Sequence, residues 1–286
     1  MPVIRPRRTW LFVPGADAAA HEAAARSGAD VLIQELEDFT PPELRPQARA
    51  LALNLFSEWK RKGHVAAVRI NPLESCGRED LAAVLKGKPD IVLMSKVVSP
   101  DQVKALASLT STEELVPNVE TAAGLLRAFE IAKAHPRVVA MLVASEDMVA
   151  DLGAERSRTG EELAYVRARF LVECRAAGVE AIDCPYTFSD VKGALAEAKR
   201  AKRLGYRMKS VVSPGHAEAL NAVFSVSVRE MKAAEEIVKA FDNARATGRE
   251  RAVVDGRLVE VPVYSAAKRL LLSASNTPLP QRRKPR

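Results

Sequence analysis

The stretch LVPNVETAAGLLRAFEIAKAHPRVVAMLVASED, residues 115–147, contains two largely apolar runs joined by an amphipathic segment. Residues 115–119 and 138–144 are typical of buried strands, and residues 122–134 have the composition of a helix. An acidic residue follows each strand, Glu120 after the first and Asp147 after the second. In a parallel α/β architecture these acids lie at the same end of neighbouring strands, where active sites form.

This placement indicates a metal site formed by Glu120 and Asp147. Mg²⁺ takes one or two carboxylates from a protein and leaves its other positions to water and substrate. Either acid alone would more often cap a helix or lie in its first turn, but the pair on adjacent strands favours a metal. Glu146 is expected to point away from Asp147, because neighbouring residues on a strand face opposite sides.

The same alternation of strand and helix runs through most of the chain. It predicts eight βα units and therefore a closed (βα)₈ TIM barrel over residues 9–225. No GxGxxG or GxxxxGK[ST] motif occurs, which disfavours a nucleotide-binding α/β fold. The predicted strands are residues 10–13, 30–36, 65–70, 91–97, 115–119, 138–144, 179–182 and 208–212.

Residues 226–275 follow a different pattern and are predicted to form a helical and hairpin extension. Two amphipathic helices are expected at residues 228–243 and 262–274, and Asp255-Gly256 is typical of a hairpin turn between them. The apolar faces of these helices have no place inside a closed barrel. We therefore expect the extension to act as a lid or subunit interface in a homo-oligomer.

Composition excludes several classes of protein. The 286 residues carry a net charge of +7, which equals the charge of the basic tails at residues 1–8 and 276–286. The rest is nearly neutral and only 5% of residues are aromatic, so nucleic-acid binding is not expected. No apolar run reaches the ~20 residues that span a membrane. Cys76, Cys174 and Cys184 have neither disulfide nor zinc spacing, which favours a reducing cytoplasm.

Further charged residues lie within or at the ends of the predicted strands. Arg69 interrupts an apolar strand, and a buried guanidinium requires an anionic partner. Lys96 and Asp183 end two other strands, and Glu37 and Asp38 follow a third. Carboxylates gathered at one rim raise one another's pKa unless cations offset them. A divalent metal together with Arg69 and Lys96 would do so.

Short motifs along the chain resemble, in order, those of the citrate lyase β-subunit-like branch of the HpcH/HpaI aldolase superfamily. The resemblance covers essentially residues 8–275. The motifs are WLFVPG (10–15), GADV (28–31), LED (36–38), VRINP (68–72), SKV (95–97), VETAAG (119–124), SEDMVADLG (145–153), AIDCPY (181–186) and DGRLVEVP (255–262).

The resemblance implies a (βα)₈ barrel, Mg²⁺-dependent carbon–carbon bond cleavage or formation, and a trimer or hexamer. By position, Glu120 and Asp147 match the family's metal ligands, which would also accept Mn²⁺. Arg69 matches the arginine that holds the oxo or carboxylate oxygens of the substrate. Glu37 and Asp38 match the pair that binds metal-bound water and orients this arginine.

Two further residues belong to the expected site. Lys96 is expected either to bind substrate or to serve as a structural ion-pair partner. Glu260 stands where active members carry an aspartate that acts as acid or base. In those members the C-terminal segment of one subunit covers the site of its neighbour, so the resemblance implies a catalytic role for Glu260 together with Arg69.

The function implied is a lyase that cleaves a 3-hydroxy-3-carboxylate acyl-CoA into an acyl-CoA and a 2-oxo acid. Citramalyl-, malyl- and citryl-CoA are the substrates expected from the family. An aldolase on a free hydroxy or oxo acid is the first alternative. Residues 17–26, which align with the first helix of the family, have little of the positive charge that meets CoA phosphates in relatives. A weakly active subunit or binding protein that needs partner chains is the second.

Overall fold

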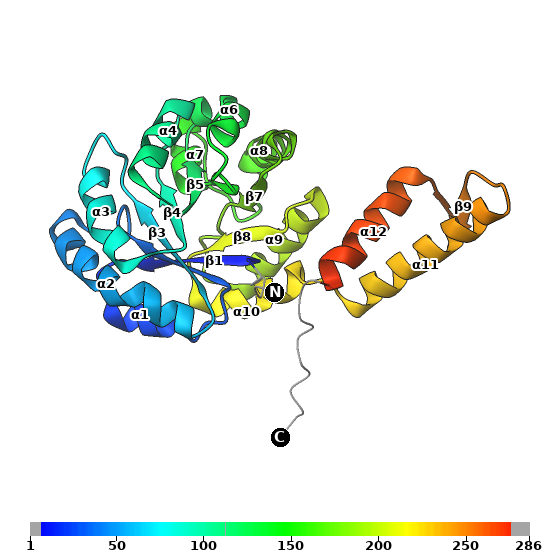
Figure 1. Ribbon diagram of the computed structural model, residues 1–286, viewed down its shortest axis with the longest axis horizontal. Coiled ribbons are helices and arrows are strands. Elements are labelled where there is room, and N and C mark those ends of the chain that lie inside the picture. The colour runs from blue at the N-terminus through cyan, green and yellow to red at the C-terminus, as the bar shows by residue number, and fades with distance from the viewer. Residues whose placement is uncertain (1–6, 112, 276–286) are drawn as a thin grey trace, which may run out of the picture. The chain divides into compact units, whose positions relative to one another are not determined.

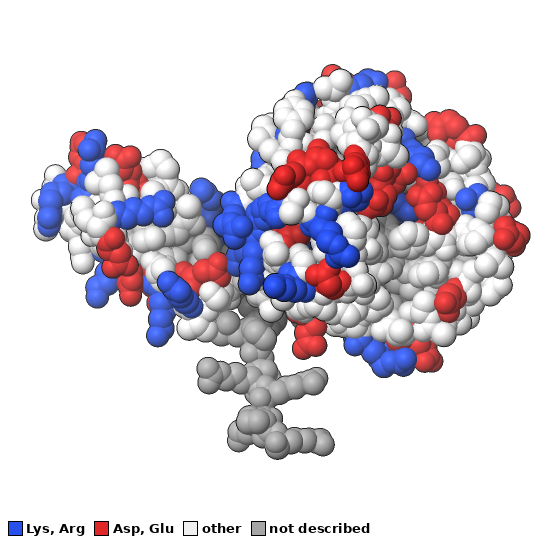
Figure 2. Space-filling view, turned by 180° about the vertical axis from the view of Figure 1, so that it is seen from behind, with Lys and Arg blue, Asp and Glu red and all other residues white. Residues whose placement is uncertain are grey.

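The computed structural model describes residues 7–111 and 113–275; most of the N-terminal tail and the whole C-terminal tail proposed from the sequence lie outside these ranges. The chain divides into a barrel unit, Arg7–Phe224, and a C-terminal unit that begins at Ser225. Arg8, assigned to the tail by sequence, forms an ion pair of 2.8 Å with Asp30, and Arg7 pairs with Glu114. Figure 2 shows both basic and acidic side chains on the surface of each unit.

Eight parallel strands close into a barrel in which β8 pairs with β1, so the predicted fold is confirmed. Helices surround the strands (Figure 1). The strands are β1 (Thr9–Pro14), β2 (Val31–Glu35), β3 (Val65–Ile70), β4 (Ile91–Met94), β5 (Glu114–Val119), β6 (Ala140–Val143), β7 (Glu180–Asp183) and β8 (Met208–Val211). The helices are α1 (Ala18–Ala24), α2 (Arg45–Arg61), α3 (Gly77–Val84), α4 (Pro100–Leu109), α5 (Ala122–Leu126), α6 (Ala128–Lys133), α7 (Glu146–Leu152), α8 (Ala164–Ala177), α9 (Val191–Leu204) and α10 (Ala217–Phe224), with short 3₁₀ turns η1 (Pro42–Leu44), η2 (Leu85–Gly87), η3 (Glu161–Leu163) and η4 (Pro214–His216).

Two helical segments differ from the sequence expectation. The predicted helix at residues 122–134 is divided into α5 and α6, because the backbone of Arg127 (φ −114°, ψ 13°) leaves the helical region. Helix α7 was not predicted. It begins directly after β6 and stops at Gly153 (φ 64°), and its seven residues are too few to show a helical period.

Alternating side chains of the strands form two separate apolar layers. Trp10, Phe12, Ile33 and Leu93 belong to the cluster that fills the barrel interior, while their sequence neighbours pack outward against the helices. Burial of each such large side chain stabilises the fold by about 1.5–3 kcal/mol. The alternation therefore determines which polar residues of a strand face the barrel interior.

The C-terminal unit consists of α11 (Val228–Ala246), β9 (Ala252–Val254), β10 (Arg257–Val259) and α12 (Val261–Ser275). Helices α11 and α12 lie side by side (Figure 1), and Phe241 stacks on Tyr264 with ring centroids 4.6 Å apart. Asp255 (φ 49°) and Gly256 (φ 73°) both adopt positive φ, as the predicted two-residue hairpin turn requires. Among the described residues of both units, no helix is long and apolar enough to cross a membrane.

Candidate active site

A cavity of about 320 Å³ lies at the carboxyl end of the barrel strands. Its charged lining consists of Asp38, Arg69, Glu146 and Asp147. The apolar lining of the same cavity includes Phe12, Phe39, Leu142, Pro185 and Val212.

Arg69 lies on the interior face of β3 and is surrounded by carboxylates. Its Nε is 2.9 Å from Glu35 Oε1, its Nη2 3.0 Å from Glu37 Oε2, and its Nη1 3.5 Å from Glu120 Oε1. Burial by itself would lower the pKa of Arg69, but the charges of Glu35, Glu37 and Glu120 raise it above its ordinary value. The expectation that this guanidinium needs an anionic partner is confirmed.

Glu35 organises the loop after β2. Its carboxylate accepts hydrogen bonds from the backbone amides of Glu37 and Phe39, both at 2.6 Å, as well as from Arg69. The side chain is fully buried. Glu35 therefore fixes the turn that presents Glu37 and Asp38 beside Arg69, a role that the sequence did not reveal.

Lys96 joins the same cluster from the loop after β4. Its Nζ lies 2.6 Å from Glu37 Oε1 and 3.8 Å from Asp38 Oδ1. The hydrogen bond to Glu37 raises the pKa of Lys96, whereas burial raises the pKa of Glu37 against the attraction of Arg69. The backbone of Lys96 has φ 54°, a left-handed conformation that is uncommon for a residue with a side chain.

Glu120 follows β5 and is fully buried. Burial raises its pKa to about 8; Arg69 opposes this shift, while the charges of Glu37 and Asp147 add to it. Its Oε2 has no hydrogen-bond partner among the residues that the structure describes. A cation beside this oxygen would satisfy it and stabilise the ionised carboxylate.

Asp147 lies in the first turn of α7 and lines the cavity. Within residues 7–111 and 113–275, no three His, Cys, Asp or Glu side chains gather closely enough to hold a metal by themselves. Two carboxylates with space for water and substrate match the coordination that Mg²⁺ prefers. The residues present therefore fit a magnesium ion shared by Glu120 and Asp147.

Glu146 was expected to turn away, and this expectation is wrong. The residue lines the cavity next to Asp147. The prediction assumed a strand, in which neighbours face opposite sides. In the first turn of α7, consecutive side chains are only about 100° apart, so both reach the cavity. Glu146 Oε1 accepts a hydrogen bond of 2.7 Å from Thr187 Oγ1, another lining residue that the sequence did not single out.

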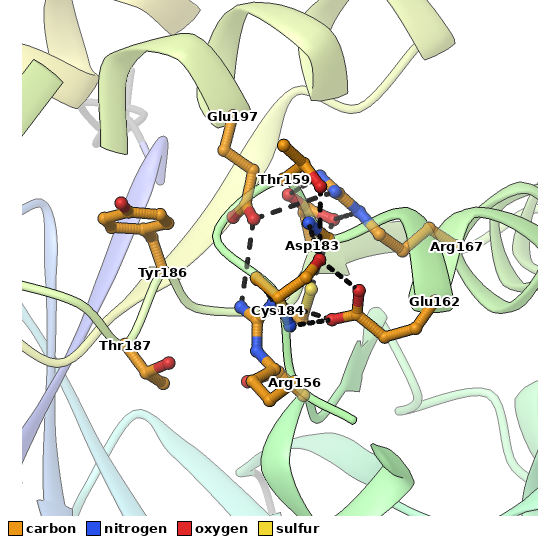
Figure 3. Close-up of polar contacts among 12 residues, drawn as sticks. Arg156, Thr159, Glu162, Arg167, Asp183, Cys184, Tyr186, Thr187 and Glu197 are labelled. Carbon is orange, nitrogen blue, oxygen red and sulfur yellow. Dashed lines mark hydrogen bonds and ion pairs between the residues drawn. The ribbon is translucent and has the colours of Figure 1, made fainter. Parts of the chain in front are cut away.

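Asp183 is not part of the rim. Its neighbour Ile182 faces the barrel interior, so Asp183 points outward toward α8. There it forms a bidentate pair with Arg167 at 2.8 and 2.7 Å and a contact of 2.7 Å with Lys209 Nζ. Figure 3 shows Asp183 beside Arg167 in this buried cluster.

Glu260 lies in the C-terminal unit, directly after β10. Its carboxylate is 3.2 Å from Arg251 Nε, and about half of its side chain is exposed. The catalytic role implied for Glu260 stays a prediction.

Residues 8–214 match the model of the HpcH/HpaI aldolase/citrate lyase family, and the chain belongs to this family. It is 34% identical over 272 residues to a (3S)-malyl-CoA thioesterase of Cereibacter sphaeroides, covering 94% of this chain and 95% of that protein. It is 32% identical over 282 residues to citrate lyase subunit beta of Escherichia coli, covering 94% and 93%. CitE of Mycobacterium tuberculosis, solved in complex with magnesium, acetoacetate and coenzyme A, matches with a TM-score of 0.78 at 27% identity, over 95% of this chain and 100% of that chain. The predicted family is confirmed.

Proposed function

We propose that the protein is a magnesium-dependent carbon–carbon lyase that acts on a 3-hydroxy-3-carboxylate acyl-CoA of the citramalyl, malyl or citryl type. The observation that carries the proposal is the position of Arg69, which lines the cavity together with Asp147 and whose Nη1 lies 3.5 Å from the buried Glu120. The CitE complex with magnesium, acetoacetate and coenzyme A supports the same ligands here. Mn²⁺ has the same preference for oxygen ligands and would replace Mg²⁺.

The reaction breaks the bond between C2 and C3 of the acyl chain. The 3-hydroxyl loses its proton, C3 becomes the carbonyl carbon of a 2-oxo acid, and the bonding electron pair passes to C2 as a thioester enolate. Protonation of C2 then gives the acyl-CoA. Magnesium held by Glu120 and Asp147 would supply Lewis acidity toward the oxygens on C3.

Arg69 is suited to hold the carboxylate and oxo oxygens, because its planar fork binds two oxygens at once. Glu35 and Glu37 hold the guanidinium in place at 2.9 and 3.0 Å. Asp38 lines the cavity, and Lys96 pairs with Glu37 and Asp38. Lys96 would help to bind the substrate, and Glu37 and Asp38 would bind the water held by the metal. The apolar residues that line the cavity would limit the entry of water to the enolate.

A homo-oligomer, a trimer or hexamer, would complete the site. Val228 and Val261 begin the two long helices of the C-terminal unit and are half exposed or more, as is Leu272 within α12. Such exposed apolar residues support an interface with another copy of the chain. Glu260 from a neighbouring subunit would then donate or accept the proton at C2.

Hydrolysis of the thioester is the second candidate, and the likeness to a (3S)-malyl-CoA thioesterase favours it. Water then attacks the thioester carbonyl, and the products are coenzyme A and the free hydroxy acid. The same metal and Arg69 would hold the substrate carboxylate in both reactions.

Product analysis tests the proposal directly. The purified chain is incubated with malyl-, citramalyl- and citryl-CoA, each with Mg²⁺ and with EDTA. The lyase releases a 2-oxo acid and an acyl-CoA only with Mg²⁺, whereas a thioesterase releases the free thiol of coenzyme A. Turnover that is unaffected by EDTA, or no turnover of any of the three, contradicts the proposed lyase.

A further inference from the structure

Arg156, in the loop after α7, contacts several segments at the carboxyl end of the barrel. Its Nε is 3.1 Å from Glu146 Oε1 and its Nη1 2.9 Å from Glu162 Oε1. The guanidinium also lies over the ring of Phe188, 5.5 Å from its centroid. Only 11% of the Arg156 side chain is exposed. One side chain thus connects the start of α7, the turn η3 and the loop after β7.

The contact with Glu146 reaches the wall of the cavity. Glu146 Oε1 accepts from both Arg156 and Thr187, and Glu146 and Thr187 both line the cavity. Arg156 itself is not among the described lining residues, so it acts on the cavity wall through its contact with Glu146. Asp147 follows Glu146 in the same helical turn. The orientation of that turn, and therefore of the Asp147 carboxylate, depends on how Glu146 is held.

On its other side, Arg156 lies within ion-pair distance of the buried ion cluster. Its Nη2 lies 3.9 Å from Glu197 Oε2, and Glu197 Oε1 lies 2.7 Å from Lys209 Nζ. Lys209 and Arg167 both bind Asp183 at 2.7 Å. Figure 3 shows Arg156 linked to Glu197 and Glu162 by dashed contacts. Because these partners are closely packed and mutually ion-paired, they give Arg156 a fixed support.

We propose that Arg156 is a positioning residue that holds the first turn of α7 against the cavity before substrate arrives. It fixes Glu146, and through the shared helical turn it sets the direction of the Asp147 carboxylate. Residues that orient metal ligands without touching the metal change its affinity by about 10–100-fold. The consequence for magnesium rests on the proposed function, whereas the ordering of α7 does not.

Arg156→Lys tests this role because it keeps the positive charge that the buried cluster requires. A single ammonium cannot contact Glu146 and Glu162 with the same fork geometry. We expect about tenfold weaker magnesium binding by calorimetry, and faster amide hydrogen exchange confined to residues 146–150. The melting temperature should change little.

Arg158→Lys is the matched control. Arg158 lies in the same loop, stacks on the same Phe188 ring at 4.6 Å and pairs with Asp190 at 2.8 Å. Among the described residues, Arg158 pairs with neither Glu146 nor the buried cluster, so magnesium affinity and exchange at residues 146–150 should match wild type. A double variant that combines Arg156→Lys with Glu146→Gln should bind magnesium no more weakly than the weaker-binding single variant, because the two changes remove the same contact.

Two results would overturn the role of Arg156. One is unchanged exchange at residues 146–150 in Arg156→Lys. The other is faster exchange throughout the barrel with a lower melting temperature and normal magnesium affinity, which is the signature of a purely structural residue. If the wild-type protein binds no magnesium, the proposed function fails, and the exchange measurement still decides whether Arg156 orders α7.

Discussion

Two clusters of charged side chains, one around Arg69 and one outside β7 and β8, differ in the balance between cations and carboxylates. Around Arg69, two cations, Arg69 and Lys96, are paired with four carboxylates, those of Glu35, Glu37, Asp38 and Glu120. Outside β7 and β8, two cations meet two carboxylates, Arg167 and Lys209 with Asp183 and Glu197, and none of the four side chains is more than 2% exposed. Arg156 connects this cluster to Glu146 and Glu162.

The pKa values follow this difference. Burial raises the pKa of Glu120 to about 8, since Arg69 cannot offset burial and the neighbouring carboxylates together. Burial would also raise the pKa of Asp183, but Lys209 and Arg167 bring it below its ordinary value. A balanced cluster is complete as folded, whereas a cluster with surplus negative charge is suited to receive a cation.

The largest effect should come from Asp147, whose charge adds to the raised pKa of Glu120 in the unbalanced cluster. We expect Asp147→Asn to abolish magnesium binding and turnover while the barrel stays folded, because the cation loses one of its two charged ligands. Calorimetry with Mg²⁺ and circular dichroism measure the two effects.

Asp101→Asn is the control for this variant. Asp101 is also a first-turn aspartate after a strand, but 82% of its side chain is exposed. Unchanged magnesium affinity in Asp147→Asn would refute the metal assignment.

The balanced cluster should respond in stability instead. Lys209→Met removes the cation that Asp183 and Glu197 share. Breaking a buried ion pair lowers the free energy of unfolding by about 3–5 kcal/mol. Chemical denaturation should detect this loss, with normal magnesium affinity in the protein that remains folded. The exposed Lys192 on α9 supplies the control Lys192→Met, which should leave stability within about 0.5 kcal/mol of wild type. If Lys209→Met and Lys192→Met are equally stable, the balanced cluster does not stabilise the fold, and the proposed difference between the two clusters is wrong.

Arg69→Lys probes the unbalanced cluster without changing its charge. We expect kcat/KM to fall about 100-fold because the fork that grips two oxygens is lost. Steady-state kinetics measure this, and the melting temperature should change modestly. Arg8→Lys, which removes a bidentate pair with Asp30 at the start of β1, should leave kcat/KM unchanged. Normal kinetics together with unfolding in Arg69→Lys would make Arg69 a structural residue.

The raised pKa of Glu120 predicts a pH dependence. Between its ordinary value of 4.5 and about 8, the folded metal-free protein holds a proton that the unfolded chain has released. Stability without metal should therefore fall as pH rises through that window. Magnesium displaces the same proton, so its affinity should rise about tenfold per pH unit up to about pH 8 and then level off. Calorimetry at a series of pH values checks this, and a flat profile would contradict it.

The smallest change in activity is expected in mixed oligomers. They test whether Glu260 of one subunit completes the active site of another. Asp147→Asn and Glu260→Gln should each be inactive alone. In randomly mixed oligomers about a quarter of the shared sites contain both wild-type residues, so about a quarter of the activity should return. No recovery in verified mixed oligomers would show that the site is not shared.

The sequence predicted the unbalanced cluster better than the balanced one. Arg69 was recognisable because a guanidinium inside an apolar strand requires an anion. Glu120 and Asp147 were recognisable because each closely follows a strand. Arg167 and Lys209 gave no such signal, since single cations in a helix and a short strand resemble surface residues. Asp183 was misplaced because a four-residue strand buried on both faces does not reveal which face is the interior.

The left-handed backbone of Lys96 has a consequence for how this protein would respond to engineering. That conformation costs a residue with a side chain about 1–3 kcal/mol, and glycine adopts it freely. Lys96→Gly would relieve the backbone but remove the cation from Glu37 and Asp38, so the gain from the relaxed backbone is set against the loss of an ion pair to the buried Glu37. A screen for heat-resistant variants should therefore also measure turnover, because a substitution that relaxes this backbone takes a charge away from the site.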